Sequence, residues 1–250
     1  MKKKLLVITN DDNIWLKPAW GKVLKSKKNN LNFKFITVPE KKIQNKNVLF
    51  YYYSVFGPLS FLMLSIFSVI RVIKFMRLKN NTFSKENTIK LESFSVSKIK
   101  NIITEYKPDF IFITCGYIIP EELINFQKNI SWINKHSSLL PEAKGVFPYI
   151  YNKINKNRQG ITFHYVLETI DTGDIVYIQE IKSTESMVSF YKEIYDNFDF
   201  YFDKFFKNHE LNIKEPQISG GSYFSYPNKK IMKNFFDSGG KIITLKDIVS

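Results

Sequence analysis

The sequence predicts an α/β fold with an open, mainly parallel β-sheet. Three short apolar runs, KKKLLVIT, LNFKFITV and DFIFIT, have the composition of strands that are buried in such a sheet. A segment with helical spacing separates the second run from the third, and this alternation of strand and helix favours parallel pairing. The 250 residues are enough for one hydrophobic core with a small appendage.

The first elements follow in order along the chain. The basic start MKKK precedes only five apolar residues, which is too short for a signal peptide and predicts a buried first strand. A second strand is expected at 31–38. The spacing over 95–107 predicts a helix, which Lys107-Pro108-Asp109 ends; its apolar side consists of Val96, Ile99, Ile102, Ile103 and Tyr106.

The later part of the chain predicts further strands and a long helix. We expect a strand at 130–134 and an antiparallel pair at 161–167 and 174–181, joined through ETIDTG. The segment 185–208 predicts one amphipathic helix, which closes a domain of residues 1–208. The extension at 209–250 shows Gly-Gly, an aromatic strand, a short helix, Gly-Gly and a strand. This order predicts a β-hairpin at a dimer edge, and a simple docked tail is the alternative.

An apolar insertion at 48–79 interrupts this layout. Val48 to Ile70 carries no charge and is long enough to span a membrane, but Gly57-Pro58 and four serines count against a span. The cations that follow, Arg71, Lys74, Arg77 and Lys79, give a helix that can lie peripherally on an anionic membrane. The alternative is a helix or hairpin packed on the domain or on a second subunit.

Composition excludes several classes of protein. The net charge of +14 comes mostly from widely spread lysines, and no RNA-recognition, zinc-finger or KH signature accompanies it, so we expect no nucleic-acid partner. The single Cys115 excludes an internal disulfide and suits a reducing cytoplasm. With one cysteine and three histidines, we expect no metal site.

Three polar residues point to chemistry. In WINKHSSLLPEAKG, Asn134 and His136 are two residues apart on a strand and therefore share a face. Asp171 lies in an Asp-Thr-Gly turn, and a carboxylate beside a histidine fixes its tautomer, whereas an Asn N–H stabilises an oxyanion. The trio suits acyl transfer without a protein nucleophile. From the residues alone, an ordinary turn and a buried core histidine remain the alternative.

The order of the fragments strengthens the functional interpretation. NKHSSLLPEAKG, GITFHYV and IDTGDI together resemble the N10-formyltetrahydrofolate-dependent formyltransferases, which show an N-x-H-x-S-L-L-P motif, then G-x-T-x-H and a D-x-G loop. FIFITCGYIIP is similar to the family's strand and loop before that motif. The resemblance is dense over 105–181 and weak over 40–90.

The resemblance implies a Rossmann-like domain that uses N10-formyltetrahydrofolate as formyl donor. Asn134, His136 and Asp171 match the catalytic trio, in which Asn134 and a protonated His136 stabilise the oxyanion and Asp171 holds His136. His164 matches a position that either faces the acceptor or is structural. The residues implied at the folate pocket are Leu91, Tyr117, Ile118, Ile119, Ser138, Leu139, Leu140, Pro141, Leu167 and Ile170.

Three branches of the family differ in the amine that they formylate. The enzyme for initiator methionyl-tRNA carries a C-terminal β-barrel, for which we expect the residues after 208 to be too few. The glycinamide ribonucleotide enzyme places phosphate in a Gly-rich loop after its first strand, but here that loop is TNDDNIW. The third branch formylates nucleotide-linked amino sugars and often has a modest C-terminal extension.

We therefore expect a cytoplasmic homodimer that can lie at the inner face of the membrane and that formylates a nucleotide-linked amino sugar. The first candidate is dTDP-4-amino-4,6-dideoxyglucose, on a path to O-antigen or another surface polysaccharide. The residues expected at the acceptor are Asn10, Asp12, Asn13, Trp15 and His164, with aromatic residues of 48–56 and of the tail stacking on the base. The alternatives are another small amine, such as glycinamide ribonucleotide, and a non-catalytic, membrane-associated scaffold that binds folate or nucleotide.

Overall fold

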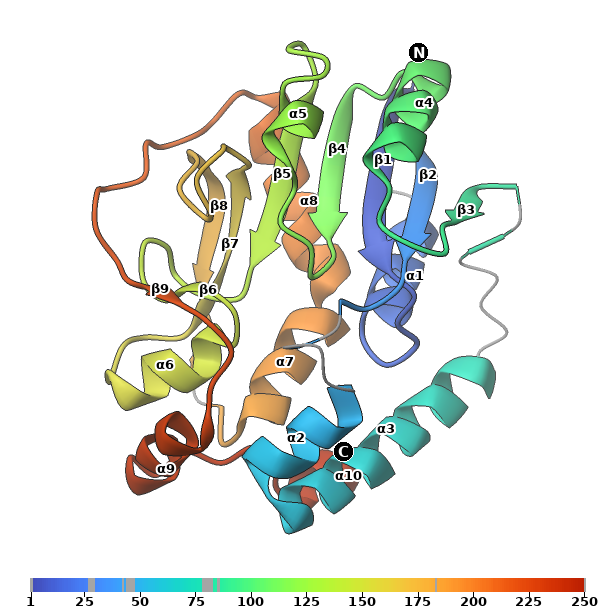
Figure 1. The fold of residues 1–250 in the computed structure, drawn as a ribbon. Helices are drawn as coiled ribbons and strands as arrows, with labels where there is room; N and C mark the ends of the chain where they lie inside the picture. The colour runs from blue at the N-terminus through green and yellow to red at the C-terminus, as the bar shows by residue number, and fades with distance from the viewer. Residues whose placement is uncertain are drawn as a thin grey trace.

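A seven-stranded sheet forms the centre of the molecule in the computed structural model (Figure 1). The structure describes residues 2–26, 30–41, 43, 48–77, 83–84, 86–182 and 184–249, so positions 78–79 of the predicted insertion and position 250 of the predicted extension lie outside the described residues. The strands are β1 (Lys3–Asn10), β2 (Leu31–Val38), β3 (Thr88–Lys90), β4 (Phe110–Thr114), β5 (Ser131–His136), β7 (Gly160–Tyr165) and β8 (Ile175–Glu180).

The strand order is β3-β2-β1-β4-β5-β7-β8. The first five strands in this order pair in parallel, whereas β7 and β8 pair antiparallel with their neighbours. The predicted open, mainly parallel α/β sheet is confirmed, and so is the antiparallel pair after it. In such a sheet, loops at the carboxyl ends of the strands build the binding site.

Helices cover both faces of the sheet, because successive residues of each strand point to opposite sides. Leu5 and Val7 of β1 belong to the core on one side, with α1 (Leu16–Lys25), α7 (Met187–Asp196) and α8 (Phe198–Glu210). Leu6 and Ile8 belong to the core on the other side, with α4 (Val96–Tyr106) and α5 (Glu121–Ile124). Figure 1 shows these helices on opposite faces.

Local capping explains where two helices begin and end. The hydroxyl of Ser95 accepts from the Lys98 N–H, and Lys107 is left-handed (φ 51°), so α4 has the predicted bounds to within a residue. The prediction of one helix over 185–208 is wrong, because α7 ends at Asp196 and α8 begins at Phe198, with Asn197 between them. Asn197 leaves helical geometry (φ −111°), and its amide donates to the Glu193 carbonyl.

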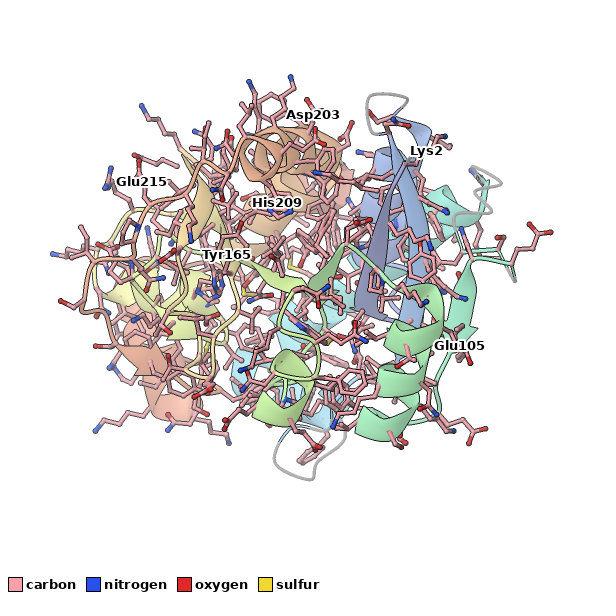
Figure 2. The ribbon with its side chains drawn as sticks, turned by 90° about the horizontal axis from the view of Figure 1, so that it is seen from above. Lys2, Glu105, Tyr165, Asp203, His209 and Glu215 are labelled. Atoms are coloured by element: carbon pink, nitrogen blue, oxygen red, sulfur yellow. The ribbon has the colours of Figure 1, made fainter. Side chains whose placement is uncertain are left out.

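The end of α8 returns to the sheet. Figure 2 shows the side chains of His209 and Tyr165 close together, and the Tyr165 hydroxyl lies 3.2 Å from Nδ1 of His209. This contact ties the last turn of α8 to β7, the strand that carries part of the site described below.

The apolar insertion forms α2 (Val48–Phe56) and α3 (Pro58–Arg77), which meet at Gly57 (φ +83°). The inner face of α3 packs on the core through Phe67 and Leu64, and its Arg71 forms two hydrogen bonds to the Asp196 carboxylate. Among the described helices, α3 is the one that is long and apolar enough to cross a membrane. This property is weak support for a span, since it reflects length and composition alone.

The predicted C-terminal hairpin is wrong. Strand β9 (Tyr223–Phe224) instead pairs in parallel with β6 (Lys144–Gly145), and helices α9 (Lys229–Asp237) and α10 (Leu245–Val249) follow. The segment at 241–244, expected as the second strand of the hairpin, instead accepts hydrogen bonds from the start of α7. The N–H groups of Met187 and Val188 donate to the carbonyls of Lys241 and Ile242. Helix α9 packs against α6 (Pro148–Ile154).

Trp20 lies within the aromatic cluster of the core, and its removal should weaken the whole fold. It is fully buried and makes edge contacts with Phe35, Phe112 and Phe198, and its Nε1 donates to Thr114. We expect Trp20→Ala to lower the free energy of unfolding by about 3–5 kcal/mol in urea titrations, because the cavity cannot fill.

The matched control is Leu245→Ala, since Leu245 is 74% exposed. This change should alter the free energy of unfolding by no more than about 0.5 kcal/mol. Equal effects of the two substitutions would contradict the central role of Trp20.

Candidate active site

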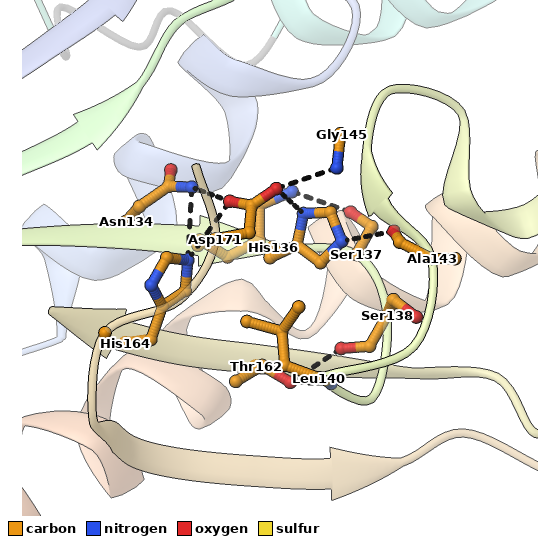
Figure 3. A network of polar contacts seen from close by, with 12 residues as sticks. Asn134, His136, Ser137, Ser138, Leu140, Ala143, Gly145, Thr162, His164 and Asp171 are labelled. Atoms are coloured by element: carbon orange, nitrogen blue, oxygen red, sulfur yellow. Dashed lines mark hydrogen bonds and ion pairs between the residues drawn. The ribbon is translucent and has the colours of Figure 1, made fainter. Parts of the chain in front are cut away.

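The strand register brings the polar residues of two strands together at the carboxyl edge of the sheet. Asn134 and His136 lie on one face of β5, as predicted, and β7 places His164 opposite Asn134 and Thr162 opposite His136. Figure 3 shows Asn134, His136 and His164 gathered around Asp171, which comes from the loop after β7, whereas Thr162 lies beside Leu140.

Asp171 is the hub of this polar network. Its Oδ2 accepts from the Gly145 N–H at 2.8 Å and lies 3.5 Å from Nδ1 of His136. Its Oδ1 lies 3.4 Å from both the Asn134 amide nitrogen and Nε2 of His164. The predicted trio is therefore brought together, and His164 joins it as a fourth member (Figure 3).

The network controls the charge on its members. Burial alone would raise the pKa of Asp171, but His136, His164 and the Gly145 N–H outweigh it and hold that pKa well below its usual range. Burial lowers the pKa of His136, although the Asp171 charge opposes this shift. Asp171 is thus an anion and His136 a neutral ring at neutral pH, which differs from the expectation of a protonated His136.

The hydrogen bonds of the two histidines fix their tautomers. Nε2 of His136 lies 2.9 Å from the Ala143 carbonyl, which can only accept, so this nitrogen carries the proton of the neutral ring. Nδ1 is left to take a proton, and Asp171 stands beside it to stabilise the cation that forms. In His164, Nδ1 donates to the Tyr165 carbonyl at 2.8 Å, and Nε2 lies 3.4 Å from the Asn134 amide.

Two glycines allow the hub to form. A Cβ on Gly145, which has φ +95°, would strike the Phe224 carbonyl, and a Cβ on Gly173 would strike the Tyr165 carbonyl. The C-terminal extension therefore holds the Gly145 backbone, and the close approach at Gly173 closes the Asp171 turn. Asp171 itself is left-handed (φ 53°), a conformation that Asp tolerates better than most residues.

Two cavities meet beside the network. The first, of about 260 Å³, contains Asn134, His136, His164 and Asp171 in its wall. The second, of about 460 Å³, is lined by rings from three helices and three loops: Trp15, Tyr52, Phe56, Phe67, Phe147, Tyr191, Tyr195 and Tyr226. Gly116, Ser137 and Val146 border both cavities, so a reacting atom in one can face a partner in the other.

Half of the residues predicted for the folate pocket line the first cavity: Tyr117, Ile118, Ile119, Leu167 and Ile170. The other five do not line it. Ser138 is fully buried and accepts from Asn152, and Leu139, Leu140 and Pro141 border a separate depression, because Thr162 draws this segment onto β7. Leu91 is 6% exposed and packs in the core with Ile119.

The predicted acceptor residues divide in the same way. Asn10, Asp12 and Trp15 line the second cavity, whereas Asn13 is exposed outside it and His164 lies in the wall of the first. The Asp12 carboxylate accepts from the N–H groups of Ile14, Trp15 and Leu16, so it shapes the start of α1.

Lys135 is a site residue that the sequence reasoning missed. Its side chain borders the first cavity, and its ammonium donates to the hydroxyls of Ser137 at 2.9 Å and Tyr195 at 3.0 Å, both in the wall of the second cavity. It has no carboxylate partner within the described residues. The sequence signal that could have indicated Lys135 is its position between the two motif residues Asn134 and His136.

The described part of the chain contains no cluster of three or more His, Cys, Asp or Glu side chains that would hold a metal ion.

Comparison with known proteins identifies the family. The sequence profile of the family described as Formyl transferase matches residues 72–197, which include the whole polar network. The chain belongs to this family. A methionyl-tRNA formyltransferase from Clostridium novyi is 32% identical over 120 residues, which cover 47% of this chain and 37% of the relative. The match thus spans little more than a third of that curated relative.

Solved structures confirm the formyltransferase fold. A 4-N formyltransferase from Francisella tularensis superposes with a TM-score of 0.59 and 19% identity, covering 95% of this chain and 88% of that one. A sugar N-formyltransferase from a Shewanella species gives a TM-score of 0.55 at 18% identity, with the same coverage. At these identities the likeness bears on the fold alone.

The buried histidines should make the fold sensitive to acid. The pKa of His136 and that of His209 are both lowered by burial from 6.5, so the unfolded chain binds protons that the folded chain does not. Their contribution to stability is full above pH 6.5 and is lost as the pH falls. We expect the free energy of unfolding in urea to decrease steadily from about pH 7.5 to about pH 5.

His209→Gln removes one of these two groups and should make the decrease shallower. A free energy of unfolding that stays constant over this pH range would contradict the neutral, buried state of His136.

Proposed function

We propose that this protein transfers the formyl group of N10-formyltetrahydrofolate to the amine of a nucleotide-linked amino sugar. The observation that carries the proposal is the meeting of two cavities beside Asn134, His136 and Asp171. A donor in the first cavity and an acceptor in the second would bring the formyl carbon and the amine to the same point.

The first cavity has the chemistry of a pocket for the donor. Apolar side chains at its mouth, Ile118 (57% exposed) and Leu167 (51% exposed), offer surfaces for flat rings, and the backbone of 116–119 offers hydrogen-bonding groups. When bound, N10-formyltetrahydrofolate supplies an activated formyl carbon.

The polar network then supplies the other requirements of the transfer. The amine nitrogen bonds to the formyl carbon, the bond from that carbon to N10 breaks, and the proton lost by the amine goes to N10. An N–H of Asn134 would face the oxygen on which negative charge develops. His136 would take the proton at Nδ1 and pass it on, and the charge of Asp171 would stabilise the protonated ring.

The second cavity supports a nucleotide-linked sugar as acceptor. Its rings offer stacking surfaces to a base and to the apolar face of a hexose. Lys135 offers a cation without a carboxylate partner in the described chain, as a diphosphate requires. We keep dTDP-4-amino-4,6-dideoxyglucose as the first candidate and surface polysaccharide synthesis in the cytoplasm as the setting.

Methionyl-tRNA is the second candidate, because the curated relative with 32% identity is named for that activity. The experiment is a mass-spectrometric assay of the full chain with N10-formyltetrahydrofolate. The acceptors are dTDP- and UDP-linked 3-amino and 4-amino sugars, initiator methionyl-tRNA and glycinamide ribonucleotide. A formyl mass gain on a sugar nucleotide alone supports the proposal, and a gain on the tRNA alone overturns it.

Loss of either catalytic side chain should affect turnover more than donor binding. We expect Asn134→Ala and His136→Ala each to lower kcat by about 10²–10³-fold, because a developing charge loses its partner. The Kd of the donor should change little. Asn101→Ala, on the exposed face of α4, is the matched control for Asn134→Ala. Near-normal turnover in both site variants would refute the assignment.

Lys135 should determine the response to acceptor charge. Because a hydrogen bond to a charged group contributes about 1.5–3 kcal/mol, we expect Lys135→Met to raise the KM for the sugar nucleotide by about 10- to 100-fold. The rate with the same amino sugar lacking its nucleotide should not change, and Lys135→Arg should retain most of the affinity. Equal losses on both acceptors would show that Lys135 only supports the fold.

A further inference from the structure

The outer face of α3 carries an uninterrupted stripe of large apolar side chains that nothing in the described chain covers. Its six members are Leu59 (71% exposed), Leu62 (57%), Ile66 (44%), Val69 (57%), Ile73 (43%) and Met76 (71%). A soluble surface seldom exposes so large a contiguous apolar patch without a partner for it. We call these six residues the α3 stripe.

The spacing of the stripe is that of a helix–helix seam. Its members are separated by three, four, three, four and three residues, which is the a/d pattern of a coiled coil. The β-branched Ile66 and Ile73 occupy successive a positions. A strict a/d stripe is narrow and fits one neighbouring helix, because each side chain inserts between four residues of its partner.

The opposite face of α3 already packs on the core, so the stripe is a second face of the helix and not its core-facing side. The opposite side of the helix packs through Phe67 and Leu64, and Arg71 anchors it to Asp196, with its guanidinium 4.6 Å from the Trp15 ring centroid. Four of the six stripe residues precede position 72, where the match to the family profile begins. The stripe thus lies mostly outside the sequence that the family shares.

Charge favours a protein partner over a lipid surface. Docking on anionic lipid uses clusters of about four to eight cations. Helices α2 and α3 contain three cations, and one of them, Arg71, is paired with Asp196. The remaining two, Lys74 and Arg77, lie at one end of α3. Two copies of α3 in antiparallel orientation would place these ends about 30 Å apart and avoid repulsion.

The exposed area is sufficient for a specific contact. Six large side chains that are about half exposed present on the order of 500 Å² per copy, so two stripes would bury about 1,000 Å², the lower limit for a specific interface. Phe50 and Tyr53 of α2, which are 59% and 50% exposed, extend the apolar surface.

We propose that the α3 stripe is a self-association surface that packs against the same stripe of a second copy, antiparallel and about a two-fold axis. In this arrangement Leu59 lies beside Met76 of the second copy, and Ile66 lies beside its Val69. The contact is isologous, since the same patch serves both copies, and it closes as a dimer.

The first test is the mass of the full chain in solution by sedimentation equilibrium. The expected result is twice 29.5 kDa for the unmodified protein and 29.5 kDa for Ile66→Glu, which places a carboxylate in the seam. Ile218→Glu is the control, because Ile218 is 78% exposed and lies in the C-terminal extension. This variant should remain a dimer. A monomeric unmodified protein, or a dimer that survives Ile66→Glu, overturns the proposal.

The second test reads the orientation by disulfide cross-linking. The double variant Leu59→Cys/Met76→Cys should form a covalent dimer on oxidation, because the two positions of one helix are about 26 Å apart and cannot bridge internally. Leu59→Cys alone should not cross-link, and the unmodified chain controls for Cys115. A cross-link in the single variant would overturn the antiparallel arrangement.

A lipid occupant is the competing outcome. Vesicles of phosphatidylglycerol and phosphatidylcholine would be sedimented with the unmodified protein and with Ile66→Glu at low salt. Co-sedimentation of a monomeric protein that Ile66→Glu abolishes would overturn self-association and assign the stripe to a membrane. A dimer that stays in the supernatant supports the proposal.

Discussion

The buried Asp171 carboxylate is the constraint on which the site depends. A buried anion is costly unless it is paired and hydrogen-bonded, and the partners of Asp171 come from three separate places in the fold. Strand β5 supplies Asn134 and His136, β7 supplies His164, and the loop after His136 supplies the Gly145 N–H. The arrangement needs the Asp171 turn to close against β7 and the Gly145 backbone to be held by β9. The C-terminal extension therefore helps to position the network without supplying one of the side chains that contact Asp171.

Apolar runs and residue spacing correctly predicted those parts of the fold that depend on residues close together in the sequence. Apolar runs identified β1, β2 and β4, because strands that are buried within a parallel sheet are rich in apolar residues. The i, i+2 spacing placed Asn134 and His136 on one face, and the G-x-T-x-H and D-x-G fragments supplied His164 and Asp171. The failures occur where partners are distant. The residues at 241–244 have the composition of a strand, but the first N–H groups of α7 take two of their carbonyls.

The cavity walls were also predicted only in part, because their residues are far apart in the sequence. Ser138 to Pro141 stand next to His136 in sequence, yet Thr162 draws them onto β7 and away from the first cavity. The second cavity was partly anticipated, through Trp15 and the aromatic residues of 48–56. Its remaining walls include residues of α3, α7, the loop before α6 and the extension, which no spacing rule connects. Lys135 is an example. It lies inside the N-x-H motif, but its ammonium donates to the hydroxyl of Tyr195, which is sixty positions later in the sequence.

The two faces of helix α3 have different roles in the structure. Leu64, Phe67 and Ser68 on its inner side form part of the second cavity, and the α3 stripe lies on its outer side. Arg71 fixes the helix at one point, through Asp196 and the Ile14 carbonyl, so the rest of its length depends on packing. A second copy on the stripe would hold this wall of the second cavity in one position and remove six apolar side chains from water. Because a residue on one face of α3 cannot move without shifting the other, the proposed assembly and the shape of the second cavity would be coupled through a single helix.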